Sequence, residues 1–75
     1  MKLEVGKVYK CSRFGDIVII TKFFPSMPQY KFQDHKKEMY MENGRNYHDL
    51  DIISEVTDET IIKNMREKYM IETKK

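Results

Sequence analysis

The run from residue 17 to residue 24, Ile-Val-Ile-Ile-Thr-Lys-Phe-Phe, constrains the fold of this chain more than any other feature. It is β-branched or aromatic almost throughout, which predicts a strand. Its first half is apolar on both faces, as expected for a central strand that is covered on both sides. The chain has only 75 residues, and a fold of many βαβ units is excluded because each unit takes about 30.

Shorter strand patterns flank this central run, and turn signals separate them. Pro25 and Pro28 interrupt the sheet because proline cannot donate to a strand ladder. The pair Asn43-Gly44 predicts a hairpin turn of type I′, whose two central residues need positive φ, and Phe14-Gly15-Asp16 predicts another turn. The further strands are expected at residues 7–12, 29–34, 38–42 and 45–48, with a last short strand or turn over Leu50, Ile52 and Ile53.

The last quarter of the chain predicts a helix over residues 58–71. Thr57 is a favourable N-cap, and acidic residues in the first turn suit the helix dipole. An apolar stripe at helical spacing gives the helix one face to bury. The stripe consists of Ile61, Ile62, Met65 and Tyr69.

Together these elements predict a fold that is mainly β with one α-helix (α+β). We expect a small five-stranded antiparallel SH3-like half-barrel over about residues 3–56, followed by the helix, in a single domain of residues 1–75. The helix is expected to cover the open end or one face of the barrel, or to pack on another chain.

Charge and cysteine content bear on the compartment and on the partner. The single cysteine, Cys11, allows no intrachain disulfide, and no apolar stretch follows Met1, so we expect a cytoplasmic protein without a signal peptide. Residues 1–31 carry six basic and two acidic side chains, whereas residues 32–56 carry three basic and six acidic ones. This asymmetry favours an anionic partner for the first half, and a normal mixed surface is the plainer interpretation.

Four short motifs resemble a known class of proteins. They are Val5-Gly6-Lys7-Val8-Tyr9, Gly15-Asp16, the segment from Tyr40 to Arg45, and the segment from Asp49 to Val56. Across about residues 5–56 the chain is similar to short bacteriophage-encoded accessory proteins that look like small SH3-like barrels. The resemblance implies a viral protein made in the host cytoplasm, and it carries over no catalytic residue. The C-terminal helix is a departure from that class.

No motif predicts catalysis, a cofactor or a metal. His48, Asp49 and Asp51 lie in one short segment without the ligand spacing of known metal sites. Cys11 is expected to be a small buried hydrophobic side chain rather than a nucleophile. We therefore expect a protein that is not an enzyme and that has neither a cofactor nor a metal.

The segment from Phe23 to Pro28 is the strongest candidate for contacting a partner, because prolines stiffen a loop that carries phenylalanine and methionine. We expect a non-catalytic binding protein, a monomer or small homo-oligomer, that modulates or inhibits a host enzyme or defence factor. The residues expected to bind are Phe24, Met27, Tyr40, Arg45 and Tyr47, with Lys63 and Arg66 on the outer face of the helix. Tyr40 is expected to point outward between two glutamates.

Two alternatives stay open from the sequence. One is a nucleic-acid-binding module in which bases stack on tyrosines such as Tyr30 and Tyr47 while cations meet phosphates. Its cations would be Lys22, Lys31 and Arg45. The other is an oligomeric sponge that sequesters a small anionic nucleotide.

Overall fold

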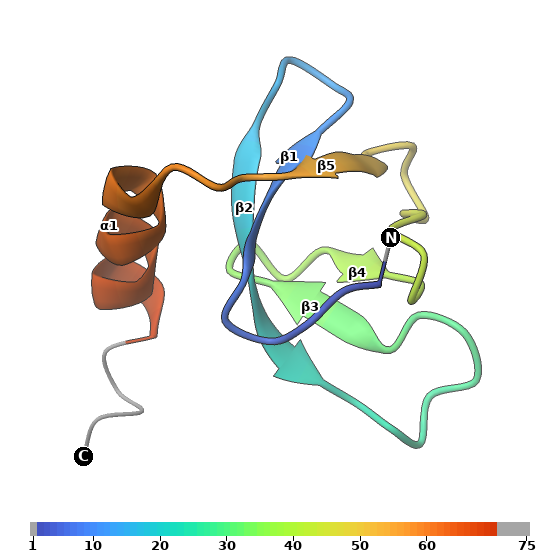
Figure 1. The fold of residues 1–75 in the computed structure, drawn as a ribbon. Helices are drawn as coiled ribbons and strands as arrows, with labels where there is room; N and C mark the ends of the chain where they lie inside the picture. The colour runs from blue at the N-terminus through green and yellow to red at the C-terminus, as the bar shows by residue number, and fades with distance from the viewer. Residues whose placement is uncertain (1, 71–75) are drawn as a thin grey trace.

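The computed structural model describes residues 2–70 and has five strands followed by one helix (Figure 1). The elements are β1 Val8–Cys11, β2 Ile17–Phe23, β3 Phe32–Asp34, β4 Met39–Tyr40, β5 Ile52–Glu55 and α1 Glu59–Tyr69. The strands form an antiparallel sheet in the order β4-β3-β2-β1-β5, which curls into a half-barrel. The predicted fold class is confirmed.

Strand β2 lies at the centre of the sheet because its two halves pair with different neighbours. Its first half pairs with β1 and its second half with β3, and the register shifts between Ile20 and Lys22. Such an irregularity bends a strand and increases its twist, which curls the sheet. Backbone hydrogen bonds from Ile52 to Gly44 (2.9 Å) and from Leu3 to Glu42 (3.2 Å) bring the far segments together.

The core fills the inside of the curled sheet. Its members come from every strand and from the segment before β1: Leu3, Tyr9, Cys11, Val18, Ile20, Phe32, Tyr40 and Ile52. Val8 and Ile19 are paired partners on β1 and β2 and are equally buried, but they lie outside this cluster. Because side chains alternate between the faces of a strand, these two lie on the outer face of the sheet.

Helix α1 covers that outer face, where it contacts β2 (Figure 1). The Tyr69 ring packs on the His35 ring, with centroids 4.1 Å apart. The stripe residues of the helix are half-buried. The helix therefore packs on its own half-barrel, and the prediction that the first half of β2 is covered on both sides is confirmed.

The N-cap of the helix lies one residue later than predicted. Asp58, rather than Thr57, is the N-cap, and its carboxylate accepts hydrogen bonds from the backbone of Thr60 (2.9 Å) and Ile61 (3.3 Å). The helix ends at Tyr69, and the predicted end at residue 71 lies outside the described residues. No described helix is long and apolar enough to span a membrane.

Two predictions about local structure are wrong. No strand forms over residues 45–48, because the Asn46 side chain accepts from the backbone of His48 (2.6 Å) and Leu50 (3.1 Å) and so stabilises a turn. A single bridge from Asn46 to Tyr40 remains. At the predicted type I′ turn only Gly44 has positive φ, so that turn has another geometry. The strands predicted at residues 29–34 and 38–42 shorten to β3 and β4.

Candidate functional site

One predicted binding residue, Tyr40, is buried in the core. Its side chain is 1% exposed, and its hydroxyl donates to Asp34 Oδ2 (2.8 Å) and lies 3.8 Å from Cys11 Sγ. The prediction of an outward Tyr40 is therefore wrong. It assumed a regular strand between the flanking glutamates, but β4 has only two residues, and pairing with β3 turns Tyr40 inward.

The buried group around Asp34 is structural. Asp34 Oδ1 accepts from the backbone of Lys36 (2.8 Å) and Glu38 (3.0 Å), which holds the turn between β3 and β4. Burial and the hydrogen bond to Asp34 raise the pKa of the Tyr40 hydroxyl far above its usual value, so it remains a donor. Burial also raises the pKa of the Cys11 thiol. A buried, protonated thiol is a poor nucleophile, which agrees with the structural interpretation of Cys11.

The remaining predicted residues of the half-barrel come from two loops that meet on one side of it (Figure 1). We call residues 24–31 and 41–51 the loop face. The rings of Tyr30 and Tyr47 meet edge to face, with centroids 5.9 Å apart, and Tyr47 also contacts His48 at 5.1 Å. Tyr47 is 73% exposed and Met27 is 41% exposed. The loop face therefore presents aromatic and thioether groups to solvent.

Phe24, the third apolar residue expected on this face, is half-buried. Its backbone N–H donates to Lys31 O (2.7 Å), which closes the loop that follows β2. Its neighbour Phe23 is more exposed and packs one side of its ring on Phe32, with centroids 5.0 Å apart. Phe24 therefore exposes only part of its side chain on this face.

A shallow hollow of about 450 Å³ separates the two loops. Pro28, Gln29 and Lys31 line it from the first loop, and Met41, Glu42 and Asn43 line it from the second, with Lys2 beside them. Its lining is mixed in polarity, so it suits an irregular protein surface better than a single small molecule.

Cations on and beside the loop face are already engaged with groups of the protein itself. Lys31 Nζ donates to the carbonyls of Pro25 and Met27. Arg45 Nε lies 3.6 Å from Asp51 Oδ2, and Lys2 Nζ lies 3.5 Å from Glu42 Oε2. The two loops together carry two basic and three acidic side chains. The proposed phosphate-binding set of Lys22, Lys31 and Arg45 therefore loses two of its cations to contacts within the protein.

The polar edge of this face is ordered by Glu38. Its Oε1 lies 3.2 Å from His48 Nδ1 and 3.3 Å from Asn46 Nδ2. The hydrogen bond to His48 is the main cause that lowers the pKa of the Glu38 carboxyl. These contacts hold His48 against the Tyr47 ring, so the aromatic group has a defined shape.

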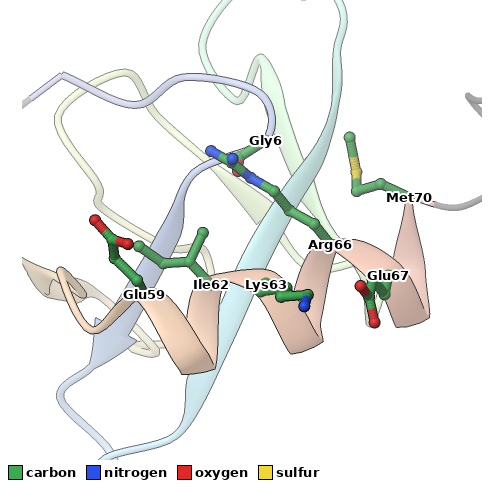
Figure 2. A pocket seen from close by; sticks show the side chains of 7 residues that line it. All are labelled: Gly6, Glu59, Ile62, Lys63, Arg66, Glu67 and Met70. Carbon is green, nitrogen blue, oxygen red and sulfur yellow. The ribbon is translucent and has the colours of Figure 1, made fainter.

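The two helix residues form a separate surface. Lys63 and Arg66 line a hollow of about 610 Å³ between α1 and the turn before β1, and Figure 2 shows the Arg66 side chain reaching toward Gly6. Arg66 Nε donates to Gly6 O at 2.8 Å. The prediction that Arg66 lies on the outer face of the helix is therefore wrong. Glu59 and Glu67 line the same hollow, so both charge signs are present there.

Sequence reasoning missed the most exposed aromatic side chain among residues 2–70. Phe14 is 88% exposed at the tip of the β1–β2 hairpin. The sequence assigned it only to a turn, and no pattern distinguishes an exposed turn phenylalanine from one that folds back onto the sheet.

Within residues 2–70, no group of three or more potential ligands is arranged to hold a metal ion. No protein-family model matches the chain, and neither a curated protein nor a solved structure matches it.

Proposed function

We propose that this chain is a small, non-enzymatic binding protein that recognises another protein through the loop face. The observation that carries the proposal is the exposed Tyr47 ring, which packs edge to face on the half-buried Tyr30 ring, on a face where Arg45 and Lys31 already contact groups of the protein. Tyrosine and methionine are enriched where protein interfaces are fully buried. A large ring with two rotatable bonds also loses little entropy when it docks.

The electrostatics of the loop face favour a protein partner over a polyanion. Nucleic-acid affinity depends mainly on cations that can neutralise phosphates. On this face, binding a phosphate through Arg45 or Lys31 would first require breaking its contacts within the protein. A protein surface with an apolar centre and a polar rim can bind without breaking these contacts.

The backbone of the loop between β2 and β3 is already restricted in the free protein. Two prolines restrict its backbone, and Lys31 Nζ donates hydrogen bonds to two of its carbonyls, those of Pro25 and Met27. Binding therefore costs less conformational entropy than it would for a free loop of eight residues. The resemblance to bacteriophage accessory proteins makes a bacterial host enzyme or defence factor the expected partner, which the chain would modulate or inhibit.

The test is capture of partners from bacterial lysate by the tagged full chain, with nuclease and at both low and high salt. We expect one stoichiometric protein that survives both treatments. Once that protein is purified, Tyr47→Ala should weaken its binding at least about 30-fold, as expected for an interface hot spot. Phe14→Asn is the matched control, since it removes an exposed aromatic ring outside the loop face.

Recovery of only nuclease-sensitive material would contradict the proposal. So would a purified partner whose affinity is the same for Tyr47→Ala and for the unmodified chain.

A further inference from the structure

The hairpin between β1 and β2 has an unfavourable residue at its tip. Phe14 and Gly15 have φ values of 59° and 62°, and the Asp16 N–H donates to Arg13 O at 3.3 Å. Positive φ at both central positions is the requirement of a type I′ turn, where Asn-Gly is strongly preferred. A bulky side chain is strained in this region.

Packing does not compensate for this strain, since Phe14 is 88% exposed. A residue that strains the turn and buries almost nothing in the folded chain does not serve the fold. An outlier of this kind points to a role in contacting a ligand.

The surroundings of Phe14 are basic. The Arg13 guanidinium lies 6.0 Å from the centre of the ring. A methyl group on Gly15 would lie 3.3 Å from Lys10 Cε, so this lysine lies beside the turn. Lys36 Nζ lies 3.5 Å from Asp16 Oδ2, which joins the turn of residues 35–38 to the hairpin.

We call this surface the basic end. It consists of Lys10, residues 13–16, Lys36 and Lys37, and it contains four cations and one carboxylate. Its hairpin lies at the start of β2, whereas the loop face begins where β2 ends (Figure 1).

We propose that the basic end binds single-stranded nucleic acid, with one base stacked on Phe14 and the neighbouring phosphates held by Arg13, Lys10 and Lys37. Aromatic rings beside cations are the usual composition of such sites, because every base has a face that can stack. An exposed ring at a hairpin tip is open to a base that is not held within a duplex.

The same observations disfavour two other occupants. A protein interface needs several apolar side chains at its centre, and Phe14 is the only apolar residue of the basic end. A membrane surface also requires a broader apolar face to bury. One exposed ring with three cations that are not paired with a carboxylate matches a polyanion with stackable bases.

The test is fluorescence anisotropy of a labelled 15-residue oligothymidine titrated with the full chain at 50 and 200 mM salt. Lys36 is paired with Asp16, which leaves Lys10, Arg13 and Lys37 for phosphates. With three phosphate contacts and a slope of about −0.7 for each contact on single strands, affinity should fall about 20-fold between the two salt concentrations. Phe14→Asn should weaken binding about 5- to 150-fold at 50 mM salt, the range for loss of one stacking ring. Phe14→Trp should retain binding.

The choice of Phe14→Asn separates binding from folding. Asparagine suits a type I′ turn better than phenylalanine, so the melting temperature of this variant should equal or exceed that of the unmodified chain. A loss of binding then cannot come from unfolding. Tyr47→Ala should leave oligonucleotide affinity unchanged, so failure of this proposal and failure of the loop-face proposal are distinguishable.

Absence of binding at 50 mM salt would overturn the proposal, and so would equal affinity of Phe14→Asn and the unmodified chain. Phe14-dependent binding to vesicles of 30% phosphatidylserine in phosphatidylcholine, without oligonucleotide binding, would assign the basic end to membranes instead.

Discussion

The hydrogen bond between Tyr40 and Asp34 is expected to be a main source of stability in this small core. Asp34 is 1% exposed, and the Tyr40 hydroxyl is the donor to its Oδ2 atom at 2.8 Å. Tyr40→Phe removes this donor and keeps the ring, so no cavity forms. A buried acceptor left without a partner costs about 1–3 kcal/mol. We therefore expect the free energy of unfolding to fall by about 2 kcal/mol.

That loss is large for a chain of this length. Stability of about 0.05–0.15 kcal/mol per residue corresponds to roughly 4–11 kcal/mol for the whole domain. At about 4–8 °C for each kcal/mol in small domains, the melting temperature should fall by about 8–16 °C. Thermal unfolding followed by circular dichroism measures this shift, and urea titration gives the free energy.

Tyr47→Phe is the matched control because it removes a hydroxyl from a ring that is 73% exposed. It should change stability by less than about 0.5 kcal/mol. A double-mutant cycle with Asp34→Asn isolates the contribution of the pair itself. A Tyr40→Phe variant as stable as the control would refute the reasoning, because Asp34 would then not need this donor.

Two further predictions concern stability. Burial lowers the pKa of His35, which packs on Tyr69. Below about pH 6.5 the unfolded chain therefore binds a proton that the folded chain does not. The melting temperature should fall as the pH is lowered from 7.5 to 5.5, and it should fall less in His35→Gln. Equal pH dependence of the two proteins would contradict this assignment. Gly44→Ala should destabilise the fold by about 1–3 kcal/mol in urea titration, because Gly44 has a φ of 95° and the new methyl group would lie 3.3 Å from Ile52 O. Asn43→Ala, at the neighbouring exposed position, is the comparison, since it removes only the hydrogen bond that Asn43 Oδ1 accepts from the Arg45 backbone (3.1 Å) and should cost less; an equal loss in both variants would locate the effect in the turn as a whole.

Periodicity was a reliable guide where a segment was long and strongly patterned. The residues of β2 and α1 could be predicted because a run of eight residues, seven of them β-branched or aromatic, and a four-residue stripe each have one consistent interpretation. The short elements were less predictable. Met39–Tyr40 is too short to show which way its side chains point, and the orientation of Tyr40 depends on its pairing with Phe32 across the sheet.

The candidate surfaces show the same division. The first loop was visible in the sequence, because Pro25 and Pro28 mark it, whereas Tyr30 and Tyr47 were expected on strands. Their contact through Tyr30 and Tyr47 was not visible, since 16 intervening residues separate the two rings along the chain. The engagement of Arg45 and Lys31 within the protein also depends on partners that only folding brings near.

The amino-acid sequence by itself determined the fold class, because alternation, turn residues and one amphipathic stripe act over a few neighbouring positions. Only the tertiary structure decided which side chains are available to a partner. It buried Tyr40 beside Asp34, directed Arg66 toward Gly6 and left Phe14 exposed in a strained turn. Each of these outcomes depends on contacts or on a backbone conformation that local pattern does not encode.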